Sequence, residues 1–276
     1  MEACFHSSNA FSNAILRTVG VRVQRKGGKG PCSVPCMCSS PSSSNDSAGL
    51  PVSTDWRSFR ARLVAREREL ASLRPNTALS LEPVLPATAG DRWAHKIHEV
   101  EKGCLLVATE KLDGVHIFVR TVILVLSTGP IGPTGIILNR PSLMSMKESR
   151  SSAYDGTGTF VDRGLYFGGP MEDGLFLVWG GSRQEAGRSG VLVEVMEGLY
   201  YGRKEGVGCA GEMVRRGVGE FRFFEGCCGW VKSQLIDEGG CWTVVACSLI
   251  VIGLVGVGGV GLWNDVLELI GPKKVL

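Results

Sequence analysis

The side chain best suited to binding chemistry is Arg140, in the segment Asn139-Arg140-Pro141, which follows a glycine-rich turn and a short apolar run. A guanidinium beside free turn amides can hold a carboxylate or a phosphate group. The same arginine can instead bond to strand-end carbonyl groups and brace the turn Gly168-Gly169-Pro170. We favour the bracing role, because both turns need a positive φ or a fixed proline whatever the protein binds.

A small ligand pocket is the most that these residues predict. We place it around Asn139, Arg140, Gly168, Gly169 and Trp230. No nucleophile or acid–base pair accompanies them, and the chain has no G-x-S-x-G motif for a serine nucleophile. We therefore predict no catalytic residue.

Three other patterns resemble metal or cofactor sites but are incomplete. His95 and His98 lack a third ligand, and the cysteines of residues 32–38 lack a second pair. Gly256–Gly261 fits G-x-G-x-x-G, but the chain ends before the acidic residue that a dinucleotide site needs about twenty positions later. We predict no metal and no cofactor.

The cysteines further along the chain lie in or beside apolar runs and are expected to behave as small buried hydrophobic residues. Cys227 and Cys228 are adjacent, and neighbouring cysteines rarely form a strain-free disulfide, so burial is the preferred interpretation.

Charge is unevenly distributed. Residues 1–50 hold five of the 30 basic and two of the 27 acidic residues, so the remainder carries 25 of each sign. A neutral body has no overall field that would gather phosphates, which disfavours general nucleic-acid binding.

Residues 1–50 are poor in acid and rich in serine, which is typical of an organellar transit peptide. We expect the chloroplast stroma, with the mitochondrion as the alternative.

Residues 51–91 are expected to link this leader to the body at 92–276. A charged helix is predicted from Thr54, with apolar residues at helical spacing and an arginine-rich face. That face could bind RNA or a membrane surface, but a solvated helix face is the commoner explanation. Residues 74–90 contain three prolines and indicate a linker.

In the body, β-branched and apolar runs between glycine-rich turns predict strands, and 3.6-residue periodicity predicts helices. The expected strands are Leu105–Thr109, Val115–Ser127 (one long or two short), Ile136–Asn139, Leu165–Phe167, Leu175–Trp179, Phe221–Phe224 and Trp242–Ile252. The expected helices are Gly206–Arg216, Val231–Glu238 and Leu262–Ile270, with His95 and His98 on a further short helix. This mixture predicts a mixed α/β (α+β) single domain with a central β-sheet core flanked by helices.

Five ordered motifs resemble the YqgE/AlgH family over roughly residues 92–272. They are Gly103–Thr109, Gly135–Pro141, Phe167–Pro170, Gly174–Val178 and Phe223–Trp230, the last followed by Gln234-Leu235 and Trp242. The leader and the long insert at 180–205 resemble the plastid branch of the family. The resemblance implies one mixed α/β domain and says little about activity. Bacterial members are labelled as transcriptional regulators, but the family fold has no helix-turn-helix.

The uncharged run Trp242–Trp263 is long enough for a transmembrane helix. We predict that it does not span a membrane, because five glycines interrupt it and its first half is rich in Val and Ile, as in a buried strand.

Two functions follow as hypotheses. The first is a non-catalytic binding, interaction or regulatory protein with an unknown protein or small-molecule partner. The second is an enzyme or regulator that acts on a phosphorylated or carboxylated small molecule through Arg140. Convergent polar groups beside Arg140 in a deep cleft would favour the second, and a shallow, apolar surface the first.

Overall fold

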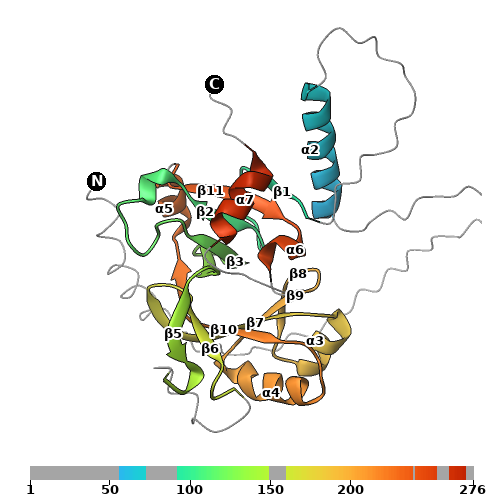
Figure 1. Ribbon diagram of the computed structural model, residues 1–276, viewed down its shortest axis with the longest axis vertical. Helices are drawn as coiled ribbons and strands as arrows, with labels where there is room; N and C mark the ends of the chain where they lie inside the picture. The colour runs from blue at the N-terminus through green and yellow to red at the C-terminus, as the bar shows by residue number, and fades with distance from the viewer. Residues whose placement is uncertain (1–55, 73–91, 149–159, 239, 254–260, 272–276) are drawn as a thin grey trace, which may run out of the picture. The chain divides into compact units, whose positions relative to one another are not determined.

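The apolar runs between residues 94 and 247 form the strands of one 11-stranded sheet (Figure 1). The structure, a computed structural model, describes residues 56–72, 92–148, 160–238, 240–253 and 261–271. All of these belong to one unit, residues 55–276. The predicted leader, the linker at 74–90 and most of the Gly256–Gly261 motif lie outside the described residues.

The strands are β1 Ala94–Lys96, β2 Leu105–Ala108, β3 Val122–Thr128, β4 Pro133–Ile137, β5 Pro141–Ser145, β6 Gly164–Phe167, β7 Met171–Gly180, β8 Val193–Met196, β9 Leu199–Arg203, β10 Phe221–Gly229 and β11 Trp242–Cys247. The α-helices of the described residues are α2 Trp56–Ser72, α3 Arg183–Ser189, α4 Val207–Arg215, α5 Lys232–Asp237, α6 Leu249–Ile252 and α7 Leu262–Ile270.

Strand order along the sheet is β1-β11-β2-β3-β4-β10-β7-β9-β8, with β6 beside β10 and β5 beside β6. Every pairing is antiparallel except that of β6 with β10. The segment 180–205, expected as an insert, supplies β8 and β9, which extend one end of the sheet, together with α3.

Strand β10 joins the two halves of the sheet. Residues 223–225 pair with β6, and Cys228 and Gly229 pair with β4 on the same side. The register against β7 shifts between Glu225 and Cys227, and the intervening Gly226 has a φ of 78°. A positive φ is easily reached only by glycine, so Gly226 allows the bulge through which β10 serves both halves.

Both faces of β2 and β3 are buried, which explains their unbroken apolar sequences. Leu105, Val107 and Leu124 pack in a central core cluster with side chains of α6 and α7. Leu106 and Ile123 point the other way, into a second cluster. A third cluster lies between β7, β10 and the helices α3 and α4.

The predicted fold class is confirmed: the chain forms a single mixed α/β domain with a large, mostly antiparallel sheet and several helices. Helix α7 has the predicted bounds, and β2, β6, α4 and α5 lie within one residue of theirs. The charged helix predicted from Thr54 is present as α2.

Several predicted elements differ from the structure: the strand predicted at Trp242–Ile252 ends at Cys247, and those predicted at Leu175–Trp179 and Phe221–Phe224 are longer, as β7 and β10. Within Val115–Ser127 only the part from Val122 is a strand, because residues 115–119 close turns in which Val115 O accepts from Phe118 N at 2.8 Å. The predicted strand Ile136–Asn139 ends at Ile137. The short helix predicted for His95 and His98 is wrong, since His95 lies in β1 and pairs with Ala246 of β11.

The uncharged run Trp242–Trp263 is divided. Strand β11 ends at Cys247, and helix α6 follows after Ser248, whose backbone N donates to Trp93 O at 3.0 Å. Residues 254–260 are outside the described part of the chain. None of the helices that the structure describes is long and apolar enough to cross a membrane.

Candidate functional site

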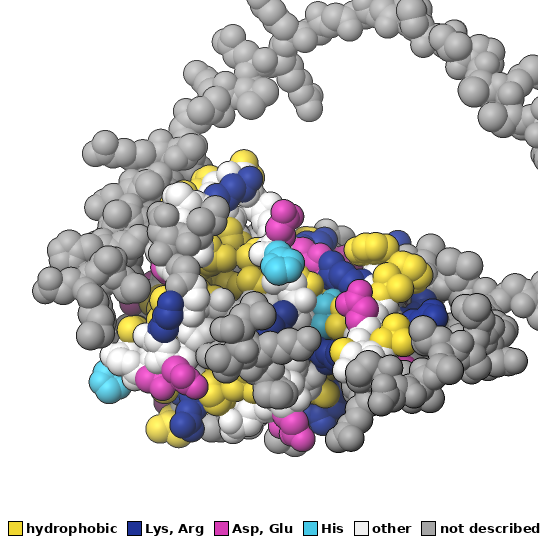
Figure 2. Space-filling view, turned by 90° about the horizontal axis from the view of Figure 1, so that it is seen from above, with side chains coloured by type: hydrophobic (Ala, Val, Ile, Leu, Met, Phe, Trp, Pro, Cys, Tyr) yellow, Lys and Arg dark blue, Asp and Glu magenta, His cyan; other side chains and the backbone are white. Residues whose placement is uncertain are grey.

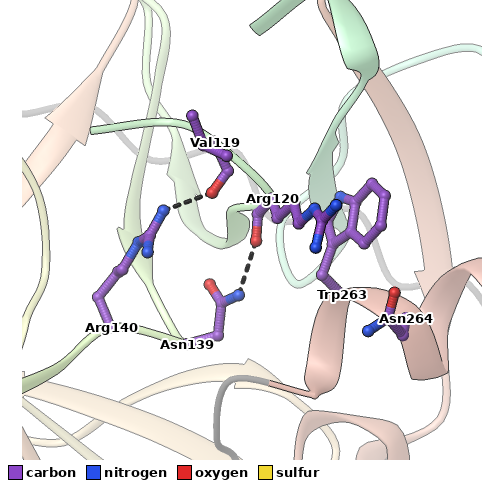
Figure 3. A pocket seen from close by; sticks show the side chains of 6 residues that line it. All are labelled: Val119, Arg120, Asn139, Arg140, Trp263 and Asn264. Atoms are coloured by element: carbon purple, nitrogen blue, oxygen red, sulfur yellow. Dashed lines mark hydrogen bonds between the residues drawn. The ribbon is translucent and has the colours of Figure 1, made fainter. Parts of the chain in front are cut away.

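A recess lies where three segments meet: the turn before β3, the residues after β4, and the first turn of α7 (Figure 3). Its volume is about 150 Å³. The lining residues are Val119, Arg120, Asn139, Arg140, Trp263 and Asn264. Two of them, Asn139 and Arg140, belong to the pocket predicted from the sequence.

Asn139 fixes the geometry of the recess. Its side chain is buried, and its carboxamide faces the turn before β3 (Figure 3). Oδ1 accepts from Val122 N at 3.0 Å, and Nδ2 donates to Arg120 O at 2.8 Å. A carboxamide supplies an acceptor and a donor side by side without charge, so Asn139 acts as a positioning residue.

Arg120 is held in an unusual conformation by this contact. Its φ is 51°, the single positive value among the non-glycine residues that the structure describes. Such a backbone costs about 1 kcal/mol or more and persists only where its surroundings fix it. The guanidinium carbon lies 5.6 Å from the centre of the Trp263 ring, within cation–π range, which adds about 0.5–1 kcal/mol of attraction at an exposed site.

Arg140 braces the same turn. Its Nη2 donates to the carbonyl of Val119, and Figure 3 shows the guanidinium pointing toward that carbonyl. A guanidinium has five N–H donors, so this one bond does not exhaust its capacity. The bracing role favoured from the sequence is therefore present, on a carbonyl of the 119–120 turn.

Trp263 forms one wall of the recess. Its Nε1 donates to Ala108 O at 2.8 Å, so the indole is tied to the end of β2. Asn264 is exposed at the rim. With the Arg120 guanidinium over the Trp263 ring and the Arg140 guanidinium in the same recess, the lining suits an anionic group that carries a short apolar stem.

The recess offers no group that exchanges protons near neutral pH. Its polar side chains are the guanidinium groups of Arg120 and Arg140 and the carboxamides of Asn139 and Asn264. Guanidinium groups stay protonated in proteins, and carboxamides do not titrate. The arrangement can bind and orient a group, but these side chains supply neither a general base nor a nucleophile.

The glycine pair of the predicted pocket serves the backbone junction. A Cβ at Gly168 would lie 2.2 Å from Gly226 O, and a Cβ at Gly169 would lie 2.3 Å from the carbonyl carbon and oxygen of Cys227. Gly168 also hydrogen-bonds to two strands: its N donates to Glu225 O of β10 at 2.7 Å, and its O accepts from Ile137 N of β4 at 2.8 Å. The two glycines follow Phe167, whose N donates to Arg140 O at 2.8 Å, but they are not among the lining residues.

Trp230 lies in another part of the domain. It is buried with Cys104, Leu106 and Ile137, and its ring meets that of Trp242 edge-on with centroids 5.8 Å apart. The structure therefore does not bring Trp230 to the recess. In its place are Arg120 and Trp263, which the sequence reasoning did not select.

The remaining candidate motifs form no second site among the described residues. No group of three or more His, Cys, Asp and Glu side chains there lies close enough together to hold a metal ion. Cys227 and Cys228 are both buried and form no disulfide, and burial raises the pKa of the Cys228 thiol well above its ordinary value.

Comparison with known proteins identifies the domain. The model of a family described as AlgH-like, DUF179, matches residues 105–274. A UPF0301 protein of Chlorobium luteolum is 32% identical over 154 residues, covering 52% of this chain and 74% of that protein. A UPF0301 protein of Chlamydia muridarum is 28% identical, covering 63% and 88%. A crystal structure of a Corynebacterium diphtheriae protein superposes with a TM-score of 0.51 at 24% identity, covering 64% of this chain and 90% of that one, which supports the fold.

Proposed function

The chain belongs to the AlgH-like DUF179 family, and we propose that it is a non-catalytic binding protein whose recess holds one acidic side chain of a protein partner. The size of the recess is the observation that supports this most directly. Its volume of about 150 Å³ is below the roughly 300–1,000 Å³ of sites that enclose whole small molecules. A single side chain from a partner's surface fits that space.

The chemistry of the lining selects an acid. Arg140 has donors beyond its bond to Val119 O, and Arg120 lies at the mouth of the recess against Trp263. A carboxylate would accept from the guanidinium groups while its methylene stem packs on the indole. A buried anchor inside a small pocket is a common source of binding energy at protein interfaces.

The second hypothesis, an enzyme or regulator acting on a small phosphorylated or carboxylated molecule through Arg140, has less support. The recess contains an arginine suited to such a ligand. It lacks the convergent polar groups of a deep cleft, and the Asn139 carboxamide is already engaged at both ends by backbone groups.

We further propose that the protein works in the plastid stroma as a member of the plastid branch of its family. The support is the acid-poor, serine-rich composition of residues 1–50.

A carboxylate probe tests the binding proposal directly. The full chain labelled with ¹⁵N is titrated with N-acetyl-glutamate N-methylamide, and the indole N–H signal of Trp263 is followed, assigned through its loss in Trp263→Phe. We expect this signal to shift with the glutamate probe and not with the isosteric N-acetyl-glutamine N-methylamide. Equal shifts with both probes, or none with either, would contradict the proposal.

A blocking variant distinguishes the two hypotheses. Asn264→Trp fills the rim of the recess, whereas Glu268→Trp places the same ring at an exposed position of α7 that does not line it. Each variant is purified from its organelle beside the wild type. We expect a protein to co-purify with the wild type and Glu268→Trp but not with Asn264→Trp. A small acid retained in native mass spectra, without any protein, would favour the second hypothesis.

A further inference from the structure

Helix α2 contacts the domain through its arginines. Arg57 donates from Nη1 to Gly103 O at 3.1 Å, and Arg60 pairs with Glu101 at 2.5 Å. At the other end of the helix, Arg68 donates from Nη1 and Nη2 to Leu269 O and Ile270 O, each at 3.3 Å. The arginine-bearing face of α2, which a helix usually exposes to solvent, is here the face that contacts the domain.

The apolar face of α2 is consequently exposed. Trp56 is 61% exposed, Phe59 44%, Leu63 46% and Leu70 51%. The rings of Trp56 and Phe59 lie 5.6 Å apart and cover each other only in part. In the view of Figure 2, hydrophobic side chains stand at the surface beside Lys, Arg, Asp and Glu side chains. A row of large apolar residues along one helix face indicates an interaction site.

The spacing along this face is that of a coiled-coil seam. Trp56, Phe59, Leu63, Arg66 and Leu70 follow steps of three, four, three and four residues, which are the a and d positions of a heptad. The flanking e and g positions have opposite charges in successive heptads: Arg60 and Arg62 in the first, Glu67 and Glu69 in the second.

We infer that α2 pairs with α2 of a second copy of this chain, the two helices running antiparallel. In an antiparallel pair, a positions meet d positions, and g positions meet g positions. When the two helices cross at a point between Leu63 and Arg66, Phe59 lies against Leu70 of the second copy, and Arg62 lies against Glu69 of the second copy. The two-fold axis repeats each contact.

Charge selects this partner and this direction. A parallel pair would place Arg66 against Arg66 at a d position, where two like charges meet. An anionic membrane would attract Arg62 but repel Glu67 and Glu69, which border the same apolar face. The antiparallel second copy instead sets Arg62 of each chain against Glu69 of the other.

Sedimentation velocity of the full chain over a dilution series tests the pairing. We expect a reversible dimer whose Kd rises at least tenfold in Leu63→Glu, because the charge enters the middle of the seam. Leu143→Glu on β5 is the matched control, since Leu143 is fully exposed and outside α2, and it should leave the Kd unchanged. A monomer at every concentration, or a dimer indifferent to Leu63→Glu, would overturn the inference.

A charge exchange tests the direction. Arg62→Glu alone and Glu69→Arg alone each set like charges opposite each other and should raise the Kd. The double variant R62E/E69R restores opposite charges only in the antiparallel pair, since a parallel pair would set the carboxylate introduced at position 62 against Glu67. Recovery of the wild-type Kd supports the antiparallel arrangement, and no recovery overturns it. A monomer that binds phosphatidylglycerol vesicles through Leu63 would overturn it in favour of lipid.

Discussion

Arg60 of α2 donates from Nε to Nε2 of His95 in β1 at 3.1 Å, so a helix arginine rests on a buried histidine. Because a guanidinium is always a donor, Nε2 of His95 must be the acceptor and the imidazole must be neutral. The imidazole also stacks on Trp93, with ring centroids 5.4 Å apart. Docking of α2 at this point therefore depends on the protonation state of one side chain.

Stability should fall as the pH drops below that of an ordinary histidine. Burial, then the charges of Arg60 and Arg68, lower the pKa of His95 from 6.5 to about 4. Between those values the unfolded chain binds a proton that the folded chain does not, so the free energy of unfolding decreases with decreasing pH. We expect little change above pH 6.5 and a loss of about 2 kcal/mol at pH 5, measured by urea unfolding.

The control for this dependence is His95→Gln, which keeps an acceptor for Arg60 but cannot titrate. Its unfolding free energy should change less between pH 7.5 and pH 5 than that of the wild type. An equal slope in both proteins would assign the dependence to other groups.

Gly169→Ala should destabilise the domain by about 3 kcal/mol or more. Gly169 has a φ of 153°, and an added Cβ would overlap the backbone of Cys227, which neither a rotamer change nor a flexible neighbour can relieve. Gly164→Ala is the matched control in β6, where an added Cβ meets nothing within 4 Å. Urea unfolding should separate the two variants clearly, and a similar small loss in both would mean that the junction is not tightly packed.

Much of the fold was predictable where the local pattern and the tertiary structure agree. Helix α7 has apolar residues at helical spacing and is capped by Gly271, and its predicted bounds hold. Strand β2 is a short apolar run, as expected for a strand that is buried on both faces. In these cases the neighbours only reinforce what the sequence favours.

The errors arose where a distant contact decides the local structure. Val115–Val119 has strand-forming residues but closes turns that Asn139 and Arg140 hold from across the fold. Beyond Cys247, Trp93 N donates to the Oγ of Ser248, 155 positions away, and Ser248 O accepts from Val251 N of α6, so the chain turns into a helix there. No local pattern contains such information.

Two of the six residues that line the site were predictable from the sequence. Asn139 and Arg140 stood out because a polar pair follows an apolar run at a strand end. Arg120 depends on a positive φ, and Trp263 on its approach to Arg120 and Ala108, so neither has a local signature. Trp230 was misleading because a tryptophan after a glycine-rich strand suggests a pocket, whereas it packs against Trp242.

Replacement of Asn139 should cost more stability than replacement of Arg140. Asn139→Ala removes two hydrogen bonds from buried or half-buried backbone groups, for an expected loss of about 2–3 kcal/mol. Arg140→Met keeps the stem and removes the donor to Val119 O, for an expected loss of about 1–2 kcal/mol. Thermal and urea unfolding measure both losses. An unchanged stability in Arg140→Met would assign the side chain wholly to a ligand.

Residues 1–50 should direct a fluorescent reporter to plastids in plant cells. Their acid-poor, serine-rich composition is typical of a transit peptide and lacks the continuous apolar core of a secretory signal. Confocal imaging beside a plastid and a mitochondrial marker decides between the two organelles, with the unfused reporter as control. Import into mitochondria alone, or a cytosolic signal, would contradict the assignment.

Buried cysteines should react more slowly than partly exposed ones. Burial raises the pKa of Cys104 and of Cys247 to about 12, so few thiolates form there at mildly alkaline pH, and solvent reaches neither side chain. Cys209 and Cys241 are partly exposed. We expect iodoacetamide to modify this second pair at least about tenfold faster in the native protein, as measured by peptide mass spectrometry over time, and all four at similar rates in concentrated urea. Rapid native labelling of Cys104 or Cys247 would show that the sheet beneath α2 opens, and would rule out the closed packing of β2 against β11.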